Sequence, residues 1–219
     1  MGAWFRLAAL IAAPLLLTGC LLTPGKFTSK LTINADRSFT YAYAGEVYAL
    51  DPNTSMGEAG TDRATDSAAK KAETDAKKRA IADALGKEAG YRSVRYLGDG
   101  KFLIDYEISG RLDHNFVYPF NLDAQAIVPF VAVELRANGT VRVKAPGFAK
   151  DSKDQAGPMG GMADSSSDKL DGRFVLDTDA EIVSTNNEDG VQGAGGRKVL
   201  SWKVSPLTRD APTAVLRVK

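Results

Sequence analysis

Hydrophobic and polar residues alternate along most of the chain after residue 26, with the period of two that half-buried β-strands show. The first alternating segment carries Phe27, Leu31 and Ile33 on one face, and a second segment follows a turn at 35–37. Further segments of this kind cover residues 45–50, 91–97, 102–109, 116–122, 127–135, 140–144, 173–184, 199–205 and 211–219. Asn138-Gly139 favours a two-residue hairpin turn, because both residues tolerate positive φ. The pattern predicts an antiparallel sheet.

One segment has the spacing of a helix instead. Between residues 62 and 87, small apolar side chains recur at the intervals of one helix face: Ala72, Ala76, Ala80, Ile81, Ala84 and Leu85. Acidic residues come early in this segment and basic residues late, as the helix dipole prefers. Its charges form either a solvated face, which we favour, or a partner-binding face. We predict an amphipathic helix whose alanine stripe packs on the sheet.

The predicted fold class is therefore α+β, a curved antiparallel β-sheet with one long inserted amphipathic helix, preceded by a signal peptide. The length suits a single α+β domain at residues 27–219. A Gly- and Ser-rich stretch near 147–172 has few large apolar groups, so we predict a mobile loop there.

Residues 1–19 have the layout of a lipoprotein signal peptide. Arg6 is their only charged residue, and the apolar run from Leu7 to Leu17 is shorter than the roughly 20 residues that a membrane-spanning helix needs. Pro14 near the end of this run further disfavours a permanent span. We expect the segment to be removed during export.

The next motif, Leu17-Thr18-Gly19-Cys20, resembles the lipobox of bacterial lipoproteins. The resemblance implies cleavage before Cys20 and a diacylglycerol on its thiol, with residues 20–26 as the acylated cysteine and a short tether. Two or more acyl chains anchor a protein stably, since each buried methylene contributes about 0.8 kcal/mol. The alternative is a free thiol in an ordinary signal sequence. Leu21 differs from the aspartate of the inner-membrane retention signal, so we predict the periplasmic face of the outer membrane.

The charge balance argues against nucleic acid as a partner. The chain has 28 basic and 27 acidic residues, and removal of Arg6 with the signal peptide leaves 27 of each. Phosphate binding needs clustered Lys and Arg, whereas the two signs are interleaved here.

Candidate catalytic groups are sparse. His114 is the only histidine, and no Gly-x-Ser-x-Gly motif is present to sharpen a serine nucleophile. The aspartates between residues 164 and 179 do not have EF-hand spacing. We therefore expect no catalytic residue, no metal site and no cofactor, and a protein that is not an enzyme.

The aromatic residues on predicted strands allow two interpretations. They either form the core, which we favour, or line a groove that accepts an acyl chain or another apolar ligand. The groove would contain Tyr41, Tyr43, Tyr106, Phe120 and Trp202.

The last part of the chain resembles the LppM-type domain of bacterial lipoproteins. The resemblance rests on residues 181–186, a Gly-rich turn and the Trp-bearing strand 198–203, together with the order of hairpin, helix and antiparallel strands. It implies an α+β envelope domain and makes lipid binding one candidate role.

These patterns lead to a functional hypothesis: a non-catalytic envelope lipoprotein, held to the membrane by its acyl anchor, that binds a lipid, a cell-wall component or an envelope protein. Two alternatives stay open. One is a carboxylate-dependent envelope hydrolase, because such enzymes need only a pair of Asp or Glu side chains. The other is a structural scaffold of an envelope complex.

Overall fold

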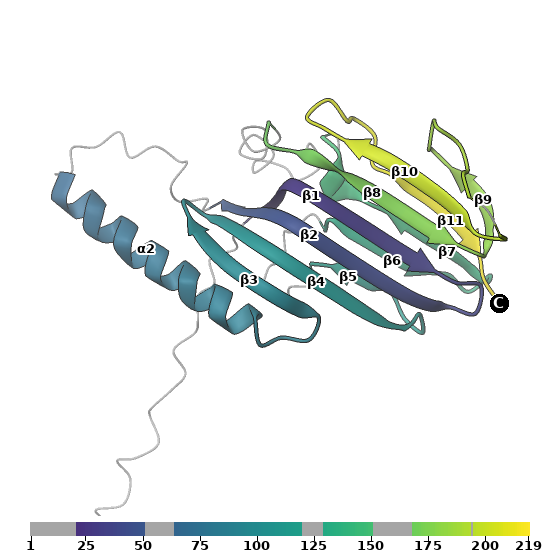
Figure 1. Ribbon diagram of the computed structural model, residues 1–219, viewed down its shortest axis with the longest axis horizontal. Helices are drawn as coiled ribbons and strands as arrows, with labels where there is room; N and C mark the ends of the chain where they lie inside the picture. Colours follow the sequence, from purple (N-terminus) through teal and green to yellow (C-terminus); the bar gives the residue numbers. More distant parts are fainter. Residues whose placement is uncertain (1–20, 51–63, 120–128, 151–167, 194) are drawn as a thin grey trace, which may run out of the picture.

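A computed structural model describes residues 21–50, 64–119, 129–150 and 168–219 apart from residue 194. Its strands form two stacked sheets, drawn one behind the other in Figure 1, and the α-helix of the described residues lies beside them. The front layer, sheet A, contains β10 (Lys198–Val204), β8 (Asp171–Thr178), β1 (Leu21–Ile33), β2 (Ser38–Leu50), β4 (Lys101–Arg111) and β3 (Tyr91–Gly98), in that order. The rear layer, sheet B, contains β5 (Phe116–Tyr118), β6 (Val131–Leu135), β7 (Thr140–Lys144), β11 (Thr213–Arg217) and β9 (Glu181–Thr185).

The predicted fold class is wrong in its architecture. The chain is a mostly β protein with two sheets, where one curved sheet and a long amphipathic helix were expected. The physical reason is that alternation marks one buried face on each strand without saying what covers it. Here the inner faces of the two sheets cover each other, as in a β-sandwich.

The predicted antiparallel pairing holds for every neighbouring pair of strands except β1 and β8, which run parallel. The Asn138-Gly139 hairpin is confirmed between β6 and β7, with Gly139 at φ 73°. The turn has three residues, 137–139, where two were expected. The backbone N–H of Arg136 donates to the Thr140 carbonyl, and this pair closes the hairpin. This length matches the three-residue hairpins that place a glycine last.

The interior of the sandwich is filled by aromatic rings from both sheets. Tyr41 of β2 lies 5.0 Å from Tyr118 of β5, measured between ring centroids, so the two layers meet directly. Further along, Phe148 stacks on Phe27 at 4.3 Å. Phe148 belongs to a buried 3₁₀ turn, η1 (Pro146–Phe148), at the start of the predicted mobile loop. Residues 151–167 of that loop lie outside the described residues.

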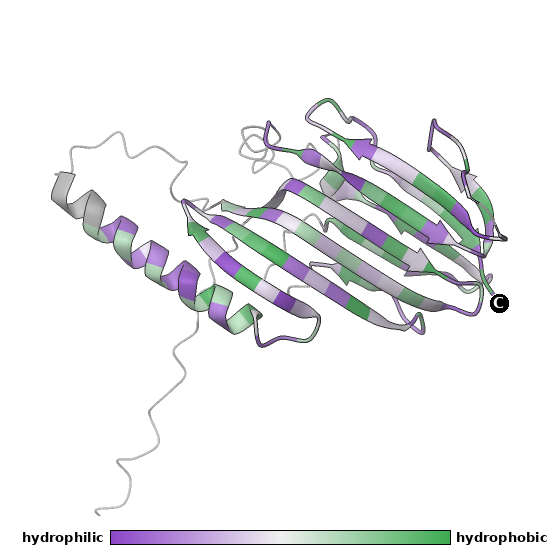
Figure 2. Ribbon diagram, viewed as in Figure 1, coloured by the Kyte–Doolittle hydropathy of each residue, from purple (hydrophilic) through white to green (hydrophobic). Residues whose placement is uncertain are grey.

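The helix α2 (Ala64–Leu85) does not pack through its alanine stripe. Ala72, Ala76, Ala80 and Ala84 are exposed, and Ala82 is the buried alanine. Figure 2 shows the helix beside β3, with hydrophilic residues distributed along it. Its contact with β3 includes a hydrogen bond from the Tyr96 hydroxyl to Asp75. Among the described residues, the main contact of the helix is with β3 at this edge of sheet A, and Lys70, Lys71 and Lys77 are exposed on the helix surface.

The predicted tether at residues 20–26 is also wrong for the part that the structure describes. β1 begins at Leu21 and pairs with β2 from that residue onward, Leu21 opposite Leu50. Pro24 lies within the strand at a shift of register, where the lost backbone donor is tolerated. The sandwich therefore starts directly after residue 20. We call this end of sheet A, where β1 begins and β2 ends, the Leu21 end.

Candidate functional site

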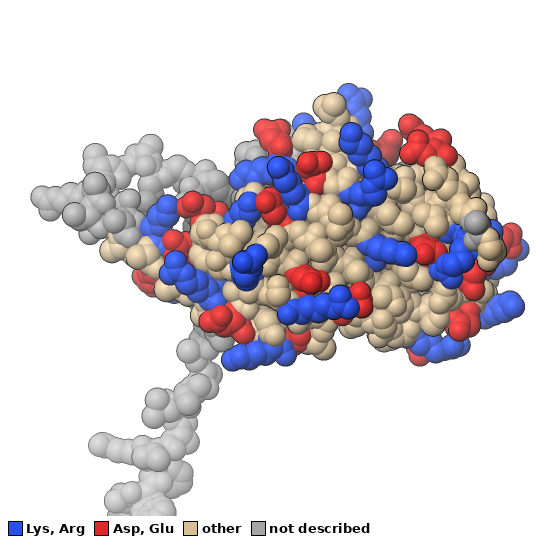
Figure 3. Space-filling model, viewed as in Figure 1, with Lys and Arg blue, Asp and Glu red and all other residues tan. Residues whose placement is uncertain are grey.

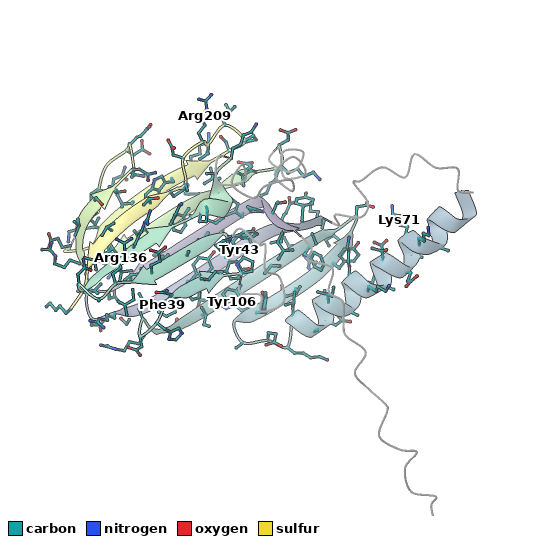
Figure 4. All side chains as sticks on the ribbon, turned by 180° about the vertical axis from the view of Figure 1, so that it is seen from behind. Phe39, Tyr43, Lys71, Tyr106, Arg136 and Arg209 are labelled. Atoms are coloured by element: carbon teal, nitrogen blue, oxygen red, sulfur yellow. The ribbon has the colours of Figure 1, made fainter. Side chains whose placement is uncertain are left out.

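The residues proposed for an apolar groove mostly belong to the core. Tyr41 and Tyr43 are fully buried, and Tyr106 is buried beside them. Figure 4 shows Tyr43 and Tyr106 among the side chains of the sandwich interior. Trp202 lies further along the core, stacked on Phe174 at 5.6 Å, while Phe120 is outside the described residues. The structure thus brings three of the five residues together as packing, and these rings fill the space that a groove would need.

The hydroxyl groups of the buried tyrosines have structural partners. Ser29 donates a hydrogen bond to the Tyr41 hydroxyl at 3.2 Å, and the Tyr43 hydroxyl donates to the Glu46 carbonyl at 2.8 Å. Burial raises the pKa of Tyr41, Tyr43 and Tyr118 well above the usual value, because a phenolate would lose its hydration. These groups therefore stay neutral near pH 7 and serve the fold.

A shallow hollow lies on the opposite, solvent-facing side of sheet A. Small side chains from the two central strands form its floor: Thr28 of β1 with Ala42 and Ala44 of β2. Longer side chains surround this floor: Lys30, Arg92, Asp105, Arg173 and Val175. We call the floor and the surrounding side chains together the outer hollow. Sequence reasoning missed this feature. The signal available was the run of small residues at the outward positions of two neighbouring strands.

The charged side chains around the outer hollow are held by neighbours on the same face. Arg92 pairs with Glu107 at 2.5 Å, and Arg173 donates a hydrogen bond to Ser201 at 3.0 Å. Lys30 pairs with Asp177 at 2.9 Å. Figure 3 shows charges of both signs distributed over this face, with uncharged surface between them. The hollow thus combines fixed donors, the Asp105 carboxylate as an acceptor, and an uncharged floor.

The Asp177 carboxylate is the most strongly held of these charges. Burial raises its pKa, but the hydrogen bonds and charges of Lys30 and Arg197 outweigh this effect, so the net shift is downward. Arg197 contacts Asp177 at 2.6 Å and also donates to Asn34. The carboxylate is therefore ionised at neutral pH and ties β8 to β1 and to the start of β10, which is a structural role.

The Leu21 end carries a second polar cluster. Glu46 pairs with Lys101 at 2.5 Å, and Tyr48 donates a hydrogen bond to the same carboxylate. The ammonium group of Lys169 lies 4.2 Å from the centre of the Tyr48 ring, a cation–π contact. Burial raises the pKa of Glu46, but the hydrogen bonds from Lys101 and from the backbone of Lys26 lower it by more. The net shift of the pKa is downward, so Glu46 stays charged. Cys20, the predicted acylation site, lies just outside the described residues.

Other candidate groups stand apart from one another. His114 is exposed between β4 and β5. Within the described ranges, no three His, Cys, Asp or Glu side chains are close enough to share a metal ion. Among the same residues, no helix combines the length and apolarity of a membrane span.

The chain was compared with family models, curated proteins and solved structures. No family model matches the chain, and none of the curated proteins compared with it is detectably similar. The solved structure of the folded domain of LppM from Mycobacterium tuberculosis matches with 17% identity over 94% of this chain and 95% of that one. The TM-score is 0.32. The neighbour is the type of domain that the sequence resemblance named, but a TM-score this low carries no argument about function.

Proposed function

We propose that this chain is an exported lipoprotein that is cleaved before Cys20, acylated there, and held on a membrane as a non-catalytic binding module. The observation that supports this most directly is the start of β1 at Leu21, immediately after the lipobox cysteine. An acylated Cys20 would fix the sandwich against the bilayer with no spacer. The predicted signal peptide, residues 1–19, supplies the export step.

Among the three ligand classes expected from the sequence, a polar cell-wall component suits this structure best. An acyl chain needs an apolar cavity, and the aromatic rings occupy the interior. The outer hollow instead offers a small uncharged floor flanked by Arg92, Arg173 and Asp105. Such a surface can seat a sugar ring on Ala42 and Ala44, with hydrogen bonds to its hydroxyl groups from the side chains around it.

The position of the outer hollow also suits an extended ligand in the envelope. Thr28 lies seven residues along β1 from Leu21, which corresponds to roughly 23 Å at the rise of a β-strand. The hollow would therefore lie clear of the lipid headgroups. Its open, shallow form accommodates a segment of a long glycan better than a small enclosed molecule.

Filling the outer hollow should weaken binding to the cell wall. We expect the wild-type protein to co-sediment with purified peptidoglycan sacculi, and Ala44→Gln to reduce the bound fraction several-fold, because the longer side chain covers the floor. The matched control is Thr32→Gln, which adds a similar side chain to the outer face of β1 outside the hollow. Equal retention of both variants, or no retention of the wild type, would remove the cell-wall ligand from this proposal.

A further inference from the structure

Two leucines are exposed at the Leu21 end of the sandwich. Leu207 is 87% exposed and Leu97 is 52% exposed, the largest values among the exposed large apolar side chains of the described residues. Leu97 lies near the end of β3, beside the turn that joins β3 to β4. Leu207 follows the end of β10. The two side chains do not form one contiguous apolar patch, so each is a separate exposed point on the surface.

The strand register shows that both leucines lie at the same end as Leu21. Gly98 pairs with Lys101, which pairs with Tyr48, which pairs with Thr23 of β1. On the other side, Val204 pairs with Gly172, which pairs with Phe27 of β1. The leucines therefore belong to the two edges of sheet A, where β3 ends near the level of Thr23 and β10 ends at the level of Phe27, six residues along β1 from Leu21. At the usual spacing of strands, β10 and β3 lie about 10 and about 14 Å from β1.

The turn that carries Leu207 is well fixed. Thr208 and Ser205 exchange hydrogen bonds, the backbone of Leu207 donates to the Ser205 hydroxyl, and Lys150 donates to the Thr208 carbonyl. These hydrogen bonds fix the backbone at Leu207, whose side chain lies in solvent. Arg209 follows two residues later and projects from the top of the sandwich as drawn in Figure 4.

Basic side chains accompany both leucines. Lys203 precedes Leu207 and Arg209 follows it, with Asp210 next to Arg209. Arg95 precedes Leu97, and Lys101 across the turn is paired with Glu46. The acidic residue of the β3–β4 turn, Asp99, is paired with Lys71 of α2 at 2.9 Å. Apolar side chains with adjacent Lys and Arg are the combination found where proteins lie in the lipid headgroup region.

We propose that Leu97 and Leu207 insert into the membrane interface on either side of the acyl anchor, so that the Leu21 end of sheet A docks on the bilayer in one fixed orientation. This inference rests on the proposed acylation of Cys20, which brings this end to the lipid. A lone acyl anchor would leave the domain free to tilt. Three contacts across one sheet, at β10, β1 and β3, would fix its orientation and hold the outer hollow away from the membrane.

The test uses the full-length lipidated protein in vesicles of phosphatidylcholine and phosphatidylglycerol. Cys20 is the only cysteine, and acylation blocks its thiol, so Leu207→Cys and Leu97→Cys each supply one site for an environment-sensitive dye. Val191→Cys is the matched control, because Val191 is 51% exposed and precedes Gln192, which pairs with Val199 at the opposite end of β10. We expect dyes at 207 and 97 to be quenched by nitroxide-bearing lipids several-fold more than a dye at 191.

Two kinds of failure can be told apart in this experiment. Equal quenching at 207, 97 and 191 in protein that is bound to vesicles would overturn the docking proposal and leave the acyl anchor intact. Protein that does not bind vesicles, and whose dye also labels Cys20, would contradict the anchor itself. Unchanged thermal unfolding of each labelled variant is required, so that quenching reports position and not misfolding.

Discussion

Replacing Cys20 by serine is expected to remove the mature protein from the outer-membrane fraction almost completely. The serine oxygen cannot form the thioether that carries diacylglycerol, and the precursor would then not be processed at the lipobox. Since two or more acyl chains supply essentially all of the stable attachment, their loss leaves no comparable anchor. Cell fractionation with detection of the precursor and mature forms measures this change.

The matched control for this prediction is Thr18→Ser, which keeps a small residue at the same motif and leaves the thiol in place. This variant should mature and fractionate as the wild type does. If the Cys20→Ser protein were still processed and still recovered with the outer membrane, attachment would have to come from another part of the chain.

Truncating Phe148 to alanine is expected to cost the largest amount of folding free energy of any single ring in the sandwich. Phe148 is fully buried, and its ring meets Phe27, Phe130 and Phe174, which come from different parts of the chain. Buried Phe→Ala changes typically cost about 3–5 kcal/mol, because they lose transfer free energy and leave a cavity. Urea denaturation of the purified variant should therefore show a much lower midpoint.

The comparison for Phe148→Ala is Leu207→Ala. Leu207 is a large side chain that contacts little protein, so in solution its truncation should change stability by no more than about 0.5 kcal/mol. Comparable midpoints for the two variants would contradict the description of a continuous aromatic core that passes through η1.

The strands were largely predictable from the sequence, because each buries one face and therefore alternates. The β6–β7 hairpin was predictable from two residues, since Asn138-Gly139 fixes a local turn geometry. These are local properties. Nothing local indicated that β8 returns to lie parallel beside β1, because that pairing joins residues far apart in the sequence. The division into two sheets depends on such pairings.

The helix shows that a periodic pattern can predict an element without predicting which of its faces packs. The spacing of Ala72, Ala76 and Ala80 correctly predicted a helix, but not which face packs. Alanine contributes little apolar area, and the contact is made instead by the hydrogen bond from the Tyr96 hydroxyl to Asp75 and by the burial of Ala82. A stripe of small residues is therefore a weak guide to burial.

The candidate sites also differ in whether local sequence or long-range strand pairing forms them. Cys20 was predicted as a site from contiguous residues, whereas the outer hollow requires Thr28, Ala44 and Arg173 to come together from three strands. Among the predicted groove residues that the structure describes, Tyr41 and Tyr43 lie on one face of β2, and that face is the packed interior. Sequence patterns identify which face is apolar, but only the pairing of sheets decides whether it is filled.

Metabolic labelling of growing bacteria with radioactive palmitate, followed by immunoprecipitation of the protein, tests the proposed acyl anchor. We expect a labelled mature band in the wild type that is missing from the Cys20→Ser variant. A wild-type protein that is expressed, exported and free of label would contradict the lipid anchor, and with it the orientation inferred for the sandwich.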